Sequence, residues 1–178
     1  MYGFSFHPAP VYPGPRSPLP FRTSFAPVWA VSYAQAIEMI KKAVQGEKND
    51  ERFYSDLIAL APDEEQQKII ASIREDERSH NRMFRDMYRS LTGQEVPPAP
   101  DEPYKKPTSY TEGLVDALFG ELGAVERYRS IWSGLPQGVY QDTLLGIIMD
   151  EQKHATKYNY LYTLNQTAAR MRAKASRL

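Results

Sequence analysis

Hydrophobic side chains recur at intervals of three and four residues along most of the chain, the spacing of one face of an α-helix. An early stretch shows this period at Ile37, Ile40, Val44, Tyr54 and Ile58, and a later one at Leu114, Leu118, Val125 and Tyr128. The pattern predicts four helices and an all-α fold. The predicted helices cover residues 31–60, 64–92, 109–134 and 139–172.

Turn residues separate the predicted helices. Pro62-Asp63 and the segment SGLPQG at 133–138 predict sharp turns, and Gly93 is a suitable C-terminal stop for the second helix. Proline fixes φ and lacks a backbone donor, so the proline-rich stretches 1–27 and 97–107 cannot be helix interiors. We read the second stretch as a linker. The predicted organisation is an N-terminal tail rich in proline and aromatic residues (1–30), a helical bundle (31–172) and a C-terminal tail (173–178).

The two halves of the predicted bundle, 31–92 and 109–172, repeat each other at an offset of 74 residues. Each carries the pattern G-E-x6-Y followed by D-E-x-x-H. Two αα-hairpins joined by a longer, proline-rich crossover predict a four-helix bundle. The matching positions are Gly46-Glu47 with Gly120-Glu121, Tyr54 with Tyr128, Asp76-Glu77 with Asp150-Glu151, and His80 with His154.

The repeated motifs place six side chains of metal-ligand type at one level of the bundle. In each half, two glutamates lie 15 residues on either side of the turn proline, about 22 Å along the helices from the turn. Each histidine follows a glutamate by three residues and therefore shares its helix face. The glutamates also continue the apolar stripes, so all six side chains should point inward. They are Glu47, Glu77, His80, Glu121, Glu151 and His154.

The electrostatics of this set favour a bound metal pair. Four buried glutamates would carry a charge of −4, and an unpaired buried carboxylate is costly enough to take up a proton instead. Two divalent cations would balance the charge, and carboxylate with imidazole suits iron or manganese. A single Glu-x-x-His on a charged helix is usually a solvated pair. Gene duplication followed by loss of a site would also leave a repeat, but here all six positions keep ligand-type residues.

Composition narrows the classes of partner. Lys and Arg balance Asp and Glu, so the formal net charge of zero gives no electrostatic footprint for nucleic acid or an anionic membrane. There is no cysteine, which excludes disulfides and thiolate-bound metal centres. No apolar run reaches the length of a membrane span, and the N-terminus lacks a signal-peptide pattern. We expect a soluble cytoplasmic protein that binds neither nucleic acid nor membrane.

On these residues the sequence resembles the ferritin-like di-iron carboxylate superfamily over about residues 33–165, and its internal repeat and compact length look most like the rubrerythrin branch. The resemblance implies two iron ions, with manganese or a mixed Mn/Fe pair as the alternative. It implies that Glu77 and Glu151 bridge the metals and that Glu47 and Glu121 are terminal ligands. All six ligand-type residues would then form the catalytic centre.

The resemblance also assigns supporting residues. Asp76 and Asp150 resemble aspartates that bond metal-bound histidines across the bundle, the alternative being plain surface acids. Tyr54 and Tyr128 resemble the site-proximal tyrosines of bacterioferritin-like proteins, where they would bond a ligand carboxylate or be oxidised, the alternative being core aromatics. Rubrerythrin has a further metal-binding glutamate where this chain has Ala124. The equivalent position in the first half is Asp50, a candidate extra ligand.

The activity implied by the resemblance is ferroxidase or peroxide reductase: bound Fe(II) is oxidised by O2, or H2O2 is reduced. An external electron donor is then needed, because a chain without cysteine has no rubredoxin-like domain. A homo-oligomer, with a dimer favoured, is also expected. Two alternatives are iron storage or sequestration, and a metal-stabilised structural protein that acts through its aromatic N-terminal tail. We assign no metal function to His7, which lies in that tail.

Overall fold

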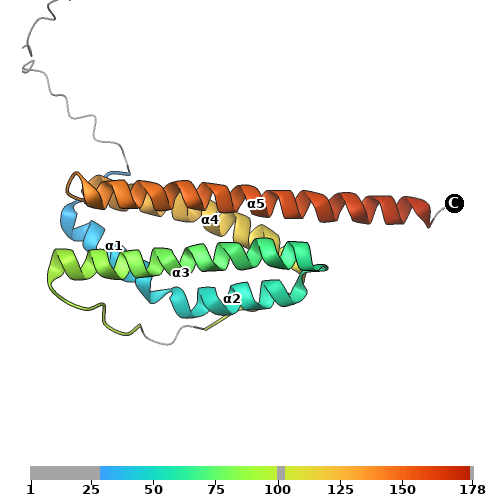
Figure 1. The fold of residues 1–178 in the computed structure, drawn as a ribbon, viewed down its shortest axis with the longest axis horizontal. Coiled ribbons are helices and arrows are strands. Elements are labelled where there is room, and N and C mark those ends of the chain that lie inside the picture. The colour runs from blue at the N-terminus through green and yellow to red at the C-terminus, as the bar shows by residue number, and fades with distance from the viewer. Residues whose placement is uncertain (1–28, 100–102, 177–178) are drawn as a thin grey trace, which may run out of the picture.

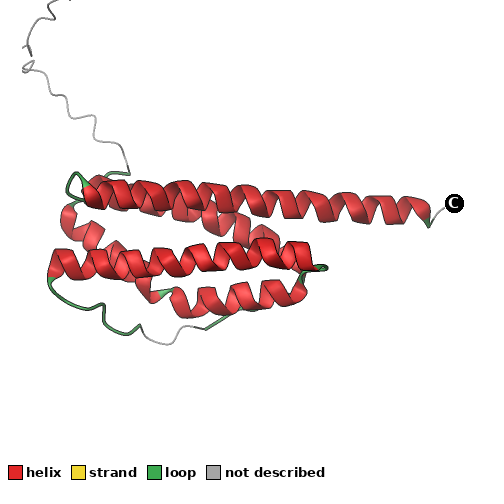
Figure 2. Cartoon of the chain, in the orientation of Figure 1, coloured by secondary structure: helices red, strands yellow, loops and turns green. Residues whose placement is uncertain are grey.

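The computed structural model describes residues 29–99 and 103–176. The predicted N-terminal tail up to residue 28, with His7, lies outside the described residues. Within them the protein is helical and has no strand, which confirms the all-α prediction (Figure 2). The helices are α1 (Tyr33–Gln45), α2 (Glu47–Leu60), α3 (Glu64–Thr92), α4 (Tyr110–Gly134) and α5 (Val139–Ala175).

The helices form a ferritin-like bundle in which α1 and α2 together take the place of one long helix (Figure 1). α4 packs along α5, and α3 packs against α5 from another side. α1 and α2 each contact both α3 and α4. The C-terminal part of α5 projects beyond the other helices (Figure 1). Neither α5 nor any other described helix is long and apolar enough to cross a membrane.

The prediction of a single helix over residues 31–60 is wrong at one point, because the helix is interrupted at Gly46. Glycine stabilises a helix interior poorly. Where α2 begins, the carbonyl of Gly46 accepts a hydrogen bond of 3.1 Å from the backbone amide of Asn49, three residues later. Asn81 of α3 donates a hydrogen bond of 3.2 Å to the Val44 carbonyl just before the interruption. The repeat counterpart, Gly120, lies inside an unbroken α4.

Most helix ends have a local cause in the sequence. Ser32, Asp63 and Ser109 cap α1, α3 and α4 by accepting hydrogen bonds from backbone amides of the first turn. Gly93 ends α3 in the left-handed conformation, with φ of 70°, where glycine is favoured. α5 runs to Ala175, three residues past its predicted end, into the predicted C-terminal tail.

The proline-rich segment between α3 and α4 lies along α1 and α2. Gln45 at the end of α1 donates a hydrogen bond of 3.0 Å to the Pro97 carbonyl. Asp56 of α2 accepts a hydrogen bond of 2.7 Å from Tyr104 and pairs with Lys106 at 2.7 Å. These contacts hold the long connection against the bundle (Figure 1).

The hydrophobic core consists of two clusters separated by a polar layer. One cluster joins α1 to the C-terminal half of α3, the end of α4 and the start of α5; it contains Ala36, Ile40, Val44, Phe84, Met87, Tyr88, Ile131, Leu135, Leu144 and Ile147. The other joins α2 to the opposite ends of the same helices; it contains Tyr54, Leu57, Ala61, Ile70, Ile73, Leu114, Ala117, Tyr158 and Leu161. The five predicted metal ligands whose side chains the structure describes lie between the clusters on α3, α4 and α5.

Candidate metal centre

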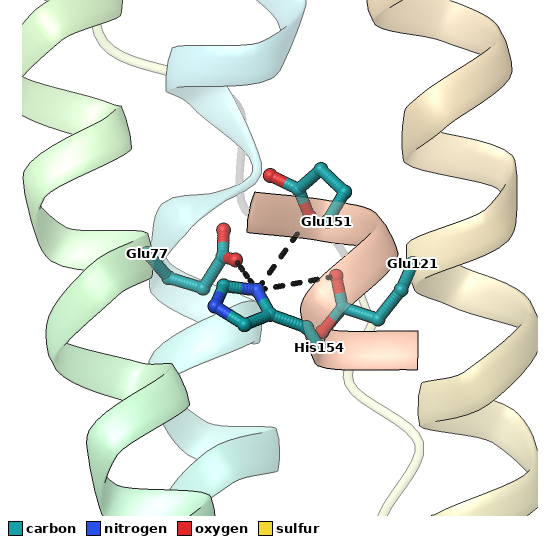
Figure 3. Close-up of side chains that lie close together, drawn as sticks. All are labelled: Glu77, Glu121, Glu151 and His154. Atoms are coloured by element: carbon teal, nitrogen blue, oxygen red, sulfur yellow. Dashed lines mark ion pairs between the residues drawn. The ribbon is translucent and has the colours of Figure 1, made fainter. Parts of the chain in front are cut away.

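Five of the six predicted ligands converge in this polar layer. Glu77 and His80 come from α3, Glu121 from α4, and Glu151 and His154 from α5. Four of these side chains are buried, while Glu77 remains partly accessible, with 20% of its side chain exposed. Figure 3 shows Glu77, Glu121 and Glu151 around the His154 ring. Glu47 is the first residue of α2, but its side chain lies outside what the structure describes, so its ligand role stays a prediction.

Two carboxylates are shared by the two imidazoles. His80 Nδ1 lies 3.1 Å from Glu151 Oε1 and 3.5 Å from Glu77 Oε1. His154 Nδ1 lies 3.0 Å from Glu77 Oε1 and 3.9 Å from Glu151 Oε2. Glu121 approaches the His154 side of the layer, with its Oε2 3.9 Å from Nδ1. The arrangement is therefore two histidine positions with Glu77 and Glu151 between them.

The other nitrogen of each ring faces an aspartate on the opposite helix. His80 Nε2 lies 3.2 Å from Asp150, and His154 Nε2 lies 3.0 Å from Asp76. Lys153 contacts both aspartates, at 2.6 and 3.3 Å. Burial alone would raise the pKa of each aspartate, but the histidine and Lys153 hold both values below 3.8. A charged aspartate that accepts a hydrogen bond from Nε2–H directs the Nδ1 lone pair into the layer.

Among the described residues, four buried atoms in the layer have no hydrogen-bond partner: the Nδ1 atoms of His80 and His154 and one oxygen each of Glu77 and Glu151. The short distances between them do not have hydrogen-bond geometry. An unsatisfied buried polar group costs roughly 1–3 kcal/mol. Ligand atoms of Glu77, Glu121, Glu151 and His154 all lie within 4.8 Å of one another. Oxygen and imidazole donors in this arrangement fit iron or manganese.

Without a cation the layer holds protons. Burial, followed by the nearby carboxylates, raises the pKa of Glu121 well above 4.5. Burial would lower the pKa of His80, but Glu151 and Glu77 raise it to about 10. Protons therefore compensate the charge of the metal-free carboxylates. Bound divalent cations would take over that compensation.

Comparison with known proteins assigns the chain to a family. The family profile of rubrerythrin matches residues 22–111, half of the chain. The chain belongs to the rubrerythrin family. It is also 32% identical over 124 residues to the uncharacterized protein YhjR of Bacillus subtilis (strain 168), an alignment that covers 70% of this chain and 84% of that protein. No solved structure matches the chain. The rubrerythrin match includes Glu77 and His80 but ends before Glu121 and the α5 residues.

The two tyrosines assigned by resemblance to bacterioferritin-like proteins occupy different surroundings. The Tyr54 hydroxyl lies 3.5 Å from Glu121 Oε1, a long hydrogen bond between the two halves of the bundle. The Tyr128 ring packs on Phe84 with a centroid separation of 4.9 Å. Burial, followed by nearby carboxylates, raises the pKa of both phenols well above 10. Both tyrosines therefore stay protonated at neutral pH.

A cavity of about 240 Å³ leads to the carboxylates between α2 and α4. Glu77, Glu121 and Glu151 line its inner part. Asp50, the candidate extra ligand, also lines it, so this side chain borders the site. Ala124, where rubrerythrin has a further glutamate, lines the same cavity, and its small side chain leaves this space open.

One polar group beside the site was absent from the sequence-based prediction. Tyr158 is fully buried, and its hydroxyl has no hydrogen-bond partner among the described residues. It follows His154 by one helical turn, and its repeat counterpart is Phe84. That difference between the halves was the available signal, but sequence alone cannot separate a hydroxyl at the site from an ordinary core tyrosine.

Proposed function

We propose that the protein is a non-haem di-iron oxidoreductase that oxidises bound Fe(II) with O2 or reduces H2O2. The observation that carries the proposal is the pair of imidazoles that share two carboxylates, with facing atoms that are buried and lack a hydrogen-bond partner in the described part of the chain. Glu77 and Glu151 would bridge the metals. Glu121 and, by prediction, Glu47 would complete the two coordination spheres.

A bound pair of Fe(II) ions supplies two electrons, which with two protons convert H2O2 into two water molecules or O2 into H2O2. The protein residues orient the metal ligands and take up or release protons. Asp76 and Asp150 fix the orientation of the imidazoles through Nε2. Tyr54 orients Glu121 through its hydroxyl. In the metal-free layer Glu121 holds a proton, because burial and the neighbouring carboxylates raise its pKa, and it would release that proton when a cation binds.

The route to the site favours a small oxidant. The cavity of about 240 Å³ is below the usual size of sites for organic ligands, and it ends at the shared carboxylates. O2 and H2O2 fit such a space. The two apolar clusters on either side limit the entry of bulk water along the bundle axis.

The test is Fe(II)-dependent consumption of oxidant by Glu77→Ala and Glu151→Ala, measured by stopped-flow with O2 and H2O2 in parallel. Both substitutions should abolish the fast reaction. Glu126→Ala, an exposed residue of α4, is the matched control and should react like the wild type. Full activity in either ligand variant would refute the assignment. The ratio of the two rates in the wild type distinguishes ferroxidase from peroxide reductase.

A further inference from the structure

A second cavity lies beside the metal layer, between α1 and α4. Its volume is about 430 Å³, within the range of sites that bind small organic molecules. Met39 and Ala43 of α1 and Tyr128 and Ile131 of α4 form its apolar wall. The cavity that reaches the carboxylates has about 240 Å³, so the two spaces suit ligands of different size.

The wall of the larger cavity carries an excess of positive charge. Lys42 and Arg127 line it, against Asp50 as the one acidic residue among its described lining residues. Both cations are exposed, and the Arg127 guanidinium lies 6.0 Å from the Tyr128 ring centroid. Two cations above an apolar wall complement a ligand with an anionic group and an aromatic body.

The two cavities share three lining residues, Asp50, Arg127 and Tyr128. Glu77, Glu121 and Glu151 line the smaller cavity. The partly buried Tyr128 ring packs on Phe84, which follows His80 by one turn of α3. A molecule in the larger cavity would therefore lie next to the cavity that reaches the metal layer, with Asp50, Arg127 and Tyr128 forming the shared wall.

We propose that the α1–α4 cavity binds a small anionic hydroquinone, which returns electrons to the metal centre between turnovers. This inference rests on the proposed function, which needs an external electron donor. The hydroquinone loses two electrons and two protons and becomes the quinone. The same electrons and protons reduce H2O2 to two water molecules, so the net reaction is hydroquinone plus H2O2 giving quinone plus two water molecules.

Binding is tested first, because its readout does not depend on activity. Isothermal titration calorimetry of the metal-free full chain would compare 2,5-dihydroxybenzenesulfonate with uncharged hydroquinone. The sulfonate should bind at least about tenfold more tightly, because it gains a charge-assisted hydrogen bond. Arg127→Gln should weaken sulfonate binding by about tenfold or more, and Arg127→Lys should weaken it less.

Arg82→Gln is the matched control. Arg82 is an exposed cation of α3 that donates a hydrogen bond to Ser79 and lines neither cavity. Its removal changes the net charge by the same amount as Arg127→Gln and should leave sulfonate binding unchanged. Equal affinity for the sulfonate and for hydroquinone, or equal losses in the two glutamine variants, would overturn the proposed binding site.

Turnover is tested next with iron-loaded protein, H2O2 and the sulfonate, by following quinone absorbance. The wild type should oxidise the sulfonate with a KM that rises about tenfold or more in Arg127→Gln. Binding without quinone formation, in protein that still consumes H2O2 with Fe(II), would overturn the reductant role and leave the proposed function standing. Binding in protein that consumes no H2O2 or O2 with Fe(II) would instead overturn the proposed function.

Discussion

Replacement of Glu121 by Gln should change stability in opposite directions without and with metal. In the metal-free protein, burial and the neighbouring carboxylates raise the pKa of Glu121 above its ordinary value of 4.5. The folded state therefore binds this proton more tightly than the unfolded chain. Its stabilising contribution is complete below pH 4.5 and is lost as the pH rises toward the folded pKa.

The size of the effect follows from the pH interval. Each pH unit above the unfolded pKa lowers the free energy of unfolding of the metal-free wild type by at most about 1.4 kcal/mol. The upper limit of this loss near pH 7.5 is therefore about 4 kcal/mol. Relaxation and water entry reduce this to about 2 kcal/mol. Glutamine carries no charge and keeps an oxygen for the Tyr54 hydroxyl. Metal-free Glu121→Gln should therefore melt about 4–8 °C above the wild type near pH 7.5 and about equal to it near pH 5.

Bound metal should reverse the order of the two melting temperatures. A metal at 100 times its dissociation constant stabilises the wild type by about 2.7 kcal/mol, whereas a variant that binds about 100-fold more weakly after losing one ligand gains only about 0.4 kcal/mol. The difference of about 2.3 kcal/mol exceeds the metal-free advantage of the variant, about 2 kcal/mol. Thermal unfolding followed by circular dichroism in EDTA and in Mn(II) measures both effects. Glu126→Gln is the exposed control on the same helix and should shift the midpoint little in either buffer. A Glu121→Gln variant that melts at or below the wild type in EDTA near pH 7.5, or gains as much from Mn(II), would refute the reasoning.

Three further sets of substitutions test other features of the structure. Asp76→Asn and Asp150→Asn remove the carboxylates that face the imidazole Nε2 atoms, so chelator competition should show about 10- to 100-fold weaker metal binding with the fold retained; unchanged affinity would exclude a positioning role. Gly134→Ala should lower the melting temperature, because the added Cβ would lie 2.8 Å from the carbonyl oxygen of Ser32, the cap of α1. At Gly146 an added Cβ meets nothing within 4 Å, so Gly146→Ala should stabilise the protein by about 0.5–1 kcal/mol. Equal shifts of the melting temperature in the two variants would contradict this packing. Ser109→Ala removes the cap of α4 and should cost about 1 kcal/mol in urea unfolding, and no change would show that the cap is unimportant.

Helix ends were predictable from sequence because their causes are local. Caps such as Asp63 and the stop at Gly93 act on amides and carbonyls within one turn. The interruption at Gly46 was not predictable from the same information. The Gly-Glu pair recurs at Gly120 inside an unbroken helix, so the sequence next to the glycine does not decide the outcome. Tertiary contacts differ between the halves, among them the hydrogen bond from Asn81.

The convergence of the site residues was predictable because the repeat and the distance from each turn fix their level in the bundle. Glu77 and Glu151 were expected between the metals, and each lies near both imidazoles. The cavities were beyond sequence reasoning, because a cavity is the space that packing leaves between helices. The place of Arg127 in a cavity wall was not predictable for the same reason, because it follows from the packing of α1 against α4.

The most direct test of the central claim is the metal stoichiometry of the protein loaded with Fe(II) under anaerobic conditions. We expect two iron ions per chain in the wild type, and loss of both when Glu77→Ala and Glu151→Ala are combined, with the helical circular dichroism spectrum retained. Iron bound at fewer than two ions per chain in the wild type, or two ions per chain in the folded double variant, would contradict the dinuclear site.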